Sequence, residues 1–370
     1  MKGMTSSNLR LAAAWGTVAI FLVVGPGMIA SATGALSALL FAWLFGVIIW
    51  SAFGVVHEAE EVAERLGEPF GTLILTLSIV IIEVALIAAV MLGSTDVPTL
   101  GRDTMFAVLM IVLNGVVGLG LLIGGLRHHQ QNFNLQGANA YLAVIIPLTV
   151  IALVLPNFTT TTSAGTLSTV QAIFFSIFTV ALYAIFIWLQ TGRHKGFFVA
   201  LGRDGEEESG SPMPHHQPGA GSTGRHVALL LANILPIIIL SKSLAKLLDQ
   251  GIAVMGAPTA LSGIIIAMIV FTPEGISALK AVAANQLTRA INLCLGAATS
   301  TLGLTVPAVL LIGLWTGQSV VLGLASAHMV LLVATLILNS LTFSGSRTTM
   351  LEGAVHLSLF FVYLVLIFSP

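Results

Sequence analysis

The sequence predicts an all-α polytopic membrane protein with about eleven transmembrane helices, and three observations lead to this fold class. Hydrophobic residues make up 56% of the chain and charged residues only 8%, whereas soluble domains contain about 25% charged residues. The mean hydropathy is +1.02. The apolar residues are also grouped into runs of about 20, the length that an α-helix needs to cross a bilayer. A water-soluble fold is excluded, because so few charges cannot cover its surface.

Charge and cysteine content exclude several other classes. The formal net charge of the 370 residues is −1, which argues against nucleic acid as a partner. Cys294 is the only cysteine, so no internal disulfide can form, and no Cys/His pattern of a resident metal or cofactor occurs. Inorganic ions and membrane lipid are the expected partners.

About eleven apolar segments account for most of the chain. We expect the first to be an uncleaved helix, because its apolar run exceeds the ~7–15 residues of a signal-peptide core; a cleaved signal peptide is the alternative. A polar helical stretch, HEAEEVAERLGE, follows the second segment. The segments are residues 12–31, 34–56, 70–93, 104–125, 139–156, 168–190, 226–247, 256–284, 288–314, 318–341 and 353–369.

Basic residues predict the orientation of these segments. With a cytoplasmic N-terminus, only Arg102, Lys242 and Lys246 would lie outside. This bias is the positive-inside pattern, and it places the C-terminus outside a membrane that we expect to be the bacterial inner membrane. The basic residues of the cytoplasmic segments are Lys2, Arg10, Arg65, Arg127, Arg193, Lys195, Arg203, Arg225, Arg289 and Arg347.

The predicted domain organisation is one N-terminal helix and two halves of five helices each. We assign residues 1–33 to the N-terminal transmembrane helix, 34–191 to the first repeat, 192–225 to a linker and 226–370 to the second repeat. Gly, Ser, Pro and acidic residues make the linker flexible and hydrophilic. An odd number of spans gives the halves opposite orientations, so they would form an inverted repeat with the substrate site at the bilayer midplane.

Two glutamates stand alone in apolar segments and are the main candidates for function. Glu83 is the only charged residue between Glu68 and Asp96, and Glu274 is the only one between Asp249 and Lys280. A carboxylate near the middle of a bilayer costs about 2.5–3.5 kcal/mol on insertion scales. We therefore expect both glutamates to bind the transported cation or protons. The alternative for each is a structural glutamate that is hydrogen-bonded within the fold.

Polar residues near the glutamates are secondary candidates for an ion path. Pro273 removes a backbone donor beside Glu274 and frees a carbonyl of the preceding turn, and freed carbonyls are cation ligands. Small residues on the same faces allow close helix packing, which explains most of the glycines without any ion. The secondary candidates are Thr76, Asn114, Ser277, Asn292, Thr299 and Ser300.

Two further groups carry weaker predictions. Glu352 and His356 are four residues apart at the start of the last span, and we expect them at the membrane interface. An acidic and histidine-containing group in the linker either senses cytosolic cation or pH or is a plain solvated connection. Its members are Glu206, Glu207, Glu208, His215 and His216.

Three stretches carry a resemblance to a known family: GEPFGTLILTLSIVIIEV, TPEGISALKAVAANQLTRAINLCLGAATSTLGLTVP and SRTTMLEGAVHLSLFF. With the hydrophilic linker between them, the chain resembles the calcium:cation antiporter superfamily, and within it the bacterial ChaA-type sodium/calcium:proton antiporters. The resemblance implies an extra first helix and two inverted five-helix repeats. It also implies that Glu83 and Glu274 correspond to the acidic residues of the Gly-Asn-Ala-x-Glu signatures.

The signatures depart from the family pattern before each glutamate. Ile79 and Val80 replace the first Gly-Asn pair, and Val270 and Phe271 replace the second. These residues supply no side-chain oxygen, whereas Ca²⁺ takes ~6–8 oxygen ligands. The resemblance therefore implies cation/proton exchange and leaves the choice among Ca²⁺, Na⁺ and K⁺ open.

Charge balance favours the same function. Two carboxylates in a low-dielectric site disfavour each other's ionised form, so the empty site needs protons or a cation. We expect a secondary active antiporter that exports Ca²⁺, Na⁺ or K⁺ in exchange for H⁺ by alternating access. No enzyme activity, catalytic residue or cofactor is expected. A passive cation channel is the main alternative, and an intramembrane hydrolase is a weaker one because no nucleophile or metal site assembles.

Overall fold

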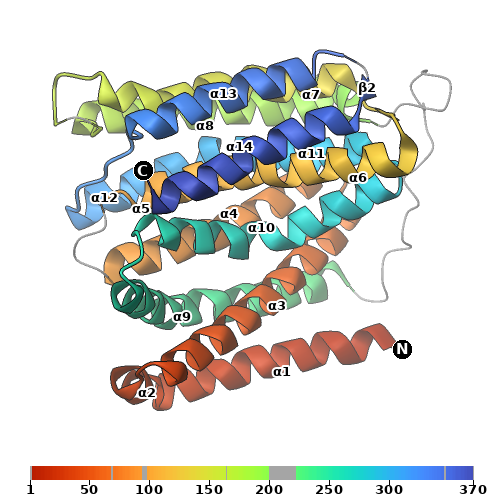
Figure 1. Cartoon of the computed structure of the whole chain (residues 1–370). Coiled ribbons are helices and arrows are strands. Elements are labelled where there is room, and N and C mark those ends of the chain that lie inside the picture. Colours follow the sequence, from red (N-terminus) through yellow and green to blue (C-terminus); the bar gives the residue numbers. More distant parts are fainter. Residues whose placement is uncertain are drawn as a thin grey trace. The chain divides into compact units, whose positions relative to one another are not determined.

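The computed structural model describes residues 2–67, 70–93, 98–163, 165–199, 222–345 and 347–369, and this part of the chain is almost entirely helical (Figure 1). The chain divides into two compact units. The first contains Met1–Leu100 and His215–Pro273, and the second contains Gly101–Pro214 and Glu274–Pro370. Each unit therefore combines residues from before and after the predicted linker. The linker residues with the acidic and histidine-containing group, 206–208 and 215–216, lie outside the described residues.

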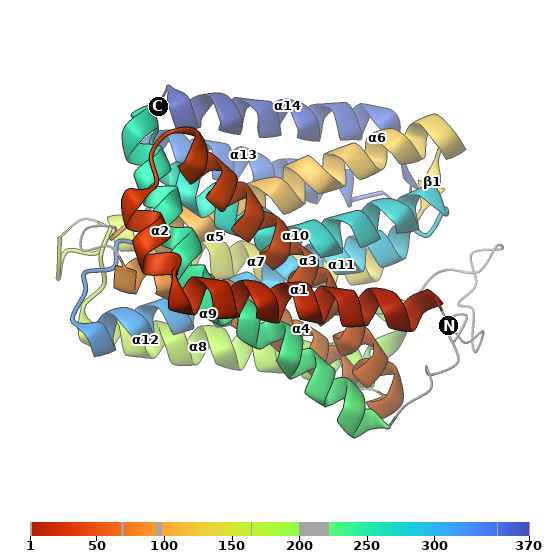
Figure 2. The ribbon, with the colours of Figure 1, turned by 90° about the horizontal axis from the view of Figure 1, so that it is seen from below.

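The first unit is built around two long helices, α3 (Ala35–Leu66) and α9 (Thr223–Met255). They pack along each other, and both also contact α1 (Lys2–Val23) and α4 (Phe70–Gly93). Figure 2 shows α1 lying across α3 and α9. The polar stretch 57–66 continues α3 without interruption, so the second apolar segment and the polar helix that follows it are one helix.

The first predicted span, 12–31, is wrong as a single straight helix. The chain bends by 71° between α1 and α2 (Gly25–Ser31). Pro26 lies in the first turn of α2, where its missing N–H is tolerated, but its ring excludes a continuous helix through the preceding turn. The Gly25-Pro26-Gly27 sequence therefore ends one helix and begins the next.

The second unit contains most of the remaining helices. The helices are α5 (Leu100–Met110), α6 (Val117–His128), α7 (Leu135–Thr149), α8 (Thr169–Trp188), α11 (Leu287–Ser300), α12 (Val306–Thr316), α13 (Ser326–Thr342) and α14 (Met350–Phe368). Helix α10 (Ala260–Ala283) begins in the first unit and continues into the second. Within the second unit, α6 packs on α14, α7 on α11, and α8 on α12; Figure 2 shows the first of these pairs clearly.

Four of the long apolar helices contain π-helical turns. The turns are η1 (Ile111–Val116), η2 (Val150–Val154), η4 (Leu189–Arg193) and η6 (Thr301–Thr305). Helix α5–η1–α6 and helix α11–η6–α12 are the third helices of the two predicted halves, and each has its π turn near its middle. Isolated π turns inside α-helices are rare and occur frequently at functional sites.

Close contact between α6 and α14 depends on glycine. A Cβ on Gly353 would lie 2.5 Å from the backbone nitrogen of Leu122, and a Cβ on Gly118 would lie 2.9 Å from the Cβ of His356. Real Cβ atoms do not approach so closely. The two backbones therefore pack against each other with no side chain between them, as small residues allow in membrane helices.

One end of the second unit is held by contacts among segments far apart in sequence. Strands β1 (Gln131–Asn132) and β2 (Arg347–Thr348) pair in antiparallel fashion. The side chain of Gln131 also donates to Asn285 Oδ1, at 2.9 Å. Asn134 caps α7 and donates to the carbonyls of Gly196 and Val199, at 3.0 and 3.2 Å. These contacts fasten the first residues of the predicted linker, including the 3-10 turns η5 (Lys195–Phe198), to the unit.

The opposite end of the second unit has its own set of contacts. Arg102 Nη1 donates to the carbonyl of Gly323 at 3.0 Å, and Asn157 Nδ2 donates to the carbonyl of Leu324 at 2.7 Å. The 3-10 turn η3 (Leu155–Asn157) supplies Asn157. Residues 318–325 have no regular secondary structure, although the predicted tenth span is 318–341. Gly317, with a φ of +69°, ends α12, and Leu324 N then donates to the carbonyl of Leu153 at 2.9 Å, so this apolar stretch is satisfied without being helical.

Among the described residues, nine helices are long and apolar enough to cross a membrane. The bent pair α1–α2 adds a tenth candidate, and α13 is a shorter apolar helix of 17 residues. Each of the predicted apolar segments therefore contains a helix, but not every segment is a full-length one. The chain is a polytopic helical membrane protein.

Candidate functional site

Glu83 is buried near the middle of α4. Its exposed fraction is 1%, and the neighbouring apolar side chains Ile82, Leu86 and Ile87 are buried as well. Helix α4 is continuous from Phe70 to Gly93 and carries no other charged residue. A carboxylate thus lies buried within an apolar helix.

Glu274 is buried in α10, directly after a proline. Its exposed fraction is 8%. Pro273 lies inside the helix, so the carbonyl of Ile269, four residues earlier, lacks its usual helical donor. The neighbouring Thr272 hydroxyl donates to the carbonyl of Met268 at 2.5 Å. The carboxylate therefore stands beside an interrupted hydrogen-bond ladder, as the sequence predicts.

The residues that replace the family's Gly-Asn pairs are buried and apolar. Ile79, Val80, Val270 and Phe271 have exposed fractions between 2% and 8%. They belong to the same helices as the two glutamates. No side-chain oxygen is available from these four positions to a bound cation.

Thr76 and Ser277 are half-buried hydroxyls on the glutamate helices. Thr76 precedes Glu83 by two turns of α4, and Ser277 follows Glu274 by one turn of α10. Residues at these spacings share a helix face. Both remain predicted members of the ion path.

Thr299 and Ser300 are buried at the end of α11, and both bond to their own helix. The Thr299 hydroxyl donates to the carbonyl of Leu295 at 2.7 Å, and the Ser300 hydroxyl donates to the carbonyl of Ala297 at 3.0 Å. Such back-bonding satisfies a hydroxyl in an apolar environment. Both residues immediately precede the π turn η6.

Asn292 holds the start of the linker. Its side-chain nitrogen donates to the carbonyl of Phe198 at 2.7 Å. Together with the bonds from Asn134, this contact ties residues 196–199 to α7 and α11. Phe198 also packs edge-on against Tyr141, with ring centroids 5.3 Å apart. The amide nitrogen of Asn292 thus holds this segment, and Asn292 stays a predicted member of the ion path.

Asn114 lies in the π turn η1 and is fully buried. Its Oδ1 accepts from His356 Nδ1 at 3.1 Å, and its Nδ2 donates to Thr335 Oγ1 at 2.8 Å. The other ring nitrogen of His356, Nε2, lies 2.9 Å from Thr342 Oγ1. A hydrogen-bonded chain therefore connects η1, α13 and α14 inside the second unit.

His356 corrects an expectation from the sequence. Its side chain is 0% exposed and lies among helices rather than at the membrane interface. Glu352, one turn earlier, forms the capping box of α14 with Thr349, which accounts for its place at the helix start. The position of His356 on an otherwise apolar helix could have indicated burial. The prediction instead followed Glu352, one turn earlier, to the membrane interface.

The described residues contain no group of three or more His, Cys, Asp or Glu side chains that could hold a resident metal ion. Glu83 and Glu274 are two buried carboxylates, each with a hydroxyl-bearing residue on its own helix.

Comparison with known proteins gives a consistent result. The model of the family described as "Sodium/calcium exchanger protein" matches residues 36–192 and 225–369. The sodium-potassium/proton antiporter ChaA of Escherichia coli (strain K12) is 42% identical over 323 residues, covering 87% of each chain. The putative ionic transporter y4hA of Sinorhizobium fredii is 39% identical over 339 residues, covering 90% of each.

Solved structures show that the fold is shared. The structure of native YfkE superposes with a TM-score of 0.74 at 18% identity, covering 98% of this chain and 100% of that one. The family model and the structural superposition agree, because both cover the residues before and after the linker. The chain therefore belongs to the sodium/calcium exchanger family, a family of membrane transport proteins rather than of enzymes.

Proposed function

We propose that this protein is a secondary active antiporter that exchanges a metal cation for protons, with Glu83 and Glu274 as the binding groups. The observation that carries the proposal is the burial of both carboxylates in apolar helices, at 1% and 8% exposure. Ionisable residues inside a membrane are expensive and mark ion paths or proton relays. The name of the E. coli relative, an antiporter of sodium, potassium and protons, supports exchange against protons.

The mechanism follows from charge balance. An ionised carboxylate is costly to bury, so each glutamate favours states with a bound proton or cation. If the protein changes its access only in those states, cation and proton move in opposite directions. The proton gradient then drives the cation out of the cell.

We infer that the two halves form an inverted repeat, with one of the two glutamates in each half. The family model matches two stretches of the chain, one on each side of the linker, and the third helix of each half contains a π turn near its middle. These similarities support two related halves with boundaries at 34–191 and 226–370. Repeats of this kind place the binding site at the midplane.

Contacts at the ends of the units support the proposed topology. In the second unit, segments after the fourth, sixth, eighth and tenth spans bond to one another through Gln131, Asn134, Asn285 and the β1–β2 pair. Segments after the third, fifth and ninth spans bond to one another through Arg102 and Asn157. The segments that follow even-numbered spans therefore lie at one end of the second unit, as they would on one side of the membrane. By the positive-inside rule that side is the cytoplasm, and the membrane is the bacterial inner membrane.

The choice of cation follows from the ligands on offer. The glutamate helices supply two carboxylates, the hydroxyls of Thr76 and Ser277, and the carbonyl of Ile269. The apolar replacements at Ile79, Val80, Val270 and Phe271 remove oxygens that a Ca²⁺ site with ~6–8 ligands would use. We propose that Na⁺ or K⁺ is carried at least as readily as Ca²⁺.

Flux measurements in proteoliposomes test the proposal. An imposed pH gradient is expected to move Na⁺, K⁺ or Ca²⁺ against its own gradient, with each cation assayed separately. Glu83→Gln and Glu274→Gln should each reduce exchange to the rate of empty liposomes, because glutamine cannot change its charge. Glu64→Gln is the matched control, since Glu64 is exposed at the end of α3. Cation flux without proton movement would instead identify a channel, and exchange by either glutamine variant would remove that glutamate from the mechanism.

A further inference from the structure

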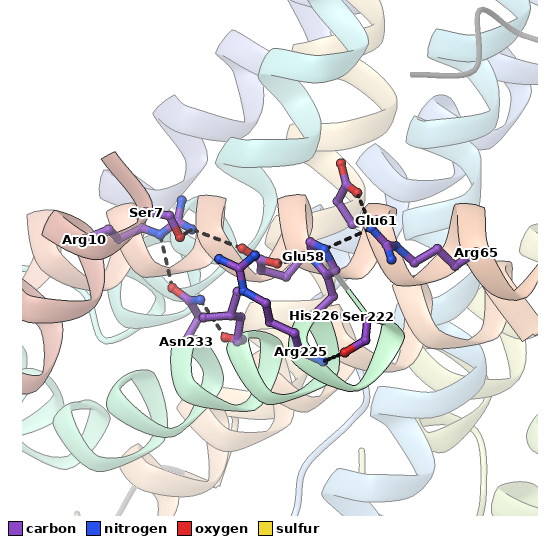
Figure 3. A network of polar contacts seen from close by, with 10 residues as sticks. Ser7, Arg10, Glu58, Glu61, Arg65, Ser222, Arg225, His226 and Asn233 are labelled. Carbon is purple, nitrogen blue, oxygen red and sulfur yellow. Dashed lines mark hydrogen bonds and ion pairs between the residues drawn. The ribbon is translucent and has the colours of Figure 1, made fainter. Parts of the chain in front are cut away.

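Buried polar side chains join helices in both units. In the first unit, Arg10, Glu58 and Asn233 connect α1, α3 and α9 (Figure 3). Glu58 Oε1 lies 3.9 Å from Arg10 Nη2, and Arg10 Nε donates to Asn233 Oδ1 at 3.1 Å. The acid and the base neutralise each other, so the packing of the three helices accounts for this network.

The network of the second unit is centred on the ring of His356, which is 0% exposed. The ring contacts the π turn η1. His356 Nδ1 lies 3.1 Å from Asn114 Oδ1, and the ring is also within hydrogen-bonding reach of the backbone of Leu113. A single ring thus holds two successive residues of a π turn, and π turns are frequent at functional sites.

Close packing of α14 on α6 fixes the place of the ring. A Cβ on Gly118 would lie 2.9 Å from the Cβ of His356 and 3.0 Å from the backbone nitrogen of Leu357. No side chain separates the two helices here, so the ring extends from one backbone to the π turn that precedes the other. Its position is therefore set by the backbone of α14.

The hydrogen bonds of the network run in one direction. Thr335 Oγ1 donates to the carbonyl of Leu331 at 2.9 Å, so it accepts from Asn114 Nδ2 at 2.8 Å. The amide oxygen of Asn114 therefore faces the ring, and this oxygen can only accept. His356 Nδ1 must then carry a proton. In the neutral ring, Nε2 accepts from the Thr342 hydroxyl at 2.9 Å.

The two hydroxyls alone do not fix this direction, because a hydroxyl can donate or accept. If Thr335 and Thr342 both turned, the amide of Asn114 could reverse and present Nδ2 to the ring. The ring would then carry its proton on Nε2. The backbone of Leu113 opposes this reversal, because a backbone carbonyl accepts a hydrogen bond and favours a proton on the side of the ring that faces η1.

The direction of the network decides what Asn114 offers to a cation. Its Nδ2 is engaged by Thr335 and, more weakly, by Met110 Sδ at 3.6 Å. Its Oδ1 has two lone pairs and one contact, with His356. Within the part of the chain that the structure describes, a lone pair of Oδ1 is therefore the unused bonding position of this side chain. Amide oxygens are cation ligands, whereas the reversed amide would place an N–H there and repel a cation.

We propose that His356 is a positioning residue for cation binding, whose Nδ1–H holds the Asn114 amide with its oxygen, and not its nitrogen, open to the transported cation. His356 itself does not bind the cation. The inference rests on the proposed function, because Asn114 is a predicted member of the ion path. The tautomer of the ring does not rest on it, so the two are tested separately.

Nitrogen-15 NMR of labelled histidines, in the full-length protein in lipid nanodiscs, reads the ring directly. The chain has 9 histidines, so His356→Gln assigns the signal by its disappearance. At about pH 8, where an ordinary histidine is neutral, the expected signal is that of a ring protonated on Nδ1 only. A ring protonated on Nε2 only would show the reversed network and overturn the proposal.

Two amide variants separate the two sides of the ring. The amide nitrogen of asparagine is as many bonds from the backbone as Nδ1, so His356→Asn keeps a donor for Asn114. The amide of glutamine corresponds to Nε2, so His356→Gln keeps only a partner for Thr342. The readout is the apparent KM for the cation in proteoliposomes. A structural defect lowers the number of active molecules and hence the maximal rate, whereas a misplaced ligand raises the KM.

His356→Gln is expected to raise the KM by on the order of tenfold, and His356→Asn to keep it within about twofold of the wild-type value. Thr342→Val is the matched control, because it removes the partner of Nε2 and leaves the donor to Asn114 in place, and it should keep the wild-type KM. An unchanged KM in His356→Gln, or an equal rise in both amide variants, would refute the positioning role. If the wild type exchanges no cation, the proposed function fails, while the ring spectrum still decides the direction of the network.

Discussion

Replacing His356 by leucine tests the buried hydrogen-bonded chain of the second unit. The substitution removes the donor to Asn114 Oδ1, at 3.1 Å, and the acceptor for Thr342 Oγ1, at 2.9 Å. Leucine fills most of the space of the ring, so the packing against Gly118 is largely kept. The effect should therefore report the polar contacts rather than a cavity.

The magnitude follows from what each partner can do afterwards. The Thr342 hydroxyl can rotate to a carbonyl of its own helix, as Thr335 and Thr299 do, so its loss is small. Asn114 is fully buried, and its Oδ1 is an acceptor that cannot turn to a backbone carbonyl as a hydroxyl can. Leaving a buried acceptor unsatisfied costs about 1–3 kcal/mol, while single hydrogen bonds between membrane helices average about 0.6 kcal/mol. We expect His356→Leu to lower the free energy of unfolding by about 2 kcal/mol, and Thr342→Val by less than about 1 kcal/mol.

A double-mutant cycle in detergent micelles measures this. His356→Leu and Asn114→Leu are made singly and together, and unfolding is followed by circular dichroism. Removing both partners should cost clearly less than the sum of the single changes, because the orphaned acceptor disappears with Asn114. Ser358→Leu is the control, since Ser358 is exposed on the same helix. Additive single effects, or a loss in His356→Leu no greater than in the control, would refute the reasoning.

Three further predictions concern packing, the linker and the cation. Gly353→Ala should lower stability by about 1–3 kcal/mol in a thermal unfolding assay, because its Cβ would meet the backbone of α6, while Gly46→Ala, with nothing within 4 Å, should not. Asn292→Leu should increase protease cleavage near residues 195–199, since the bond to the Phe198 carbonyl is lost; unchanged cleavage would mean that the other contacts suffice. Val80→Asn together with Phe271→Asn should raise the rate of Ca²⁺ exchange relative to Na⁺ exchange, because amide oxygens are added beside both glutamates, and an unchanged ratio would place these positions outside the ion site.

The sequence predicts the helical membrane fold because hydropathy is a local property. Runs of apolar residues require helices in a bilayer, so each predicted segment contains one. Breaks within a segment depend on finer signals. The Gly25-Pro26-Gly27 sequence indicates a break in the helix, although the mean hydropathy of the whole segment does not. The non-helical stretch 318–325 is mostly apolar and gives no such sign, because its backbone donates to the carbonyls of Leu153 and Gly165, far away in sequence.

In the candidate site, too, local features could be predicted from the sequence and contacts between distant residues could not. The burial of Glu83 and Glu274 follows from their isolation among apolar residues, and both are buried. The engagement of Asn292 with Phe198 could not be predicted, because 94 residues separate the two. The same holds for Arg10 and Asn233, which are 223 residues apart. Side chains of this kind find partners only when the helices pack.

The π turns have a consequence for the rotational phase of the helices that contain them. An α-helix advances by about 100° per residue, whereas a π turn, with its i→i+5 hydrogen bonds, fits one additional residue into nearly the same rotation. The residues that α6 presents to α14 are therefore displaced by one position from the pattern that α5 would continue, and α12 is displaced from α11 in the same way. Deleting one residue within Ile111–Val116 should turn the π turn into an α-helical turn and leave Gly118 and Gly125 facing α14. Single-residue deletions should therefore be tolerated better in this turn than elsewhere in the same helix, where they would rotate every later residue by about 100°.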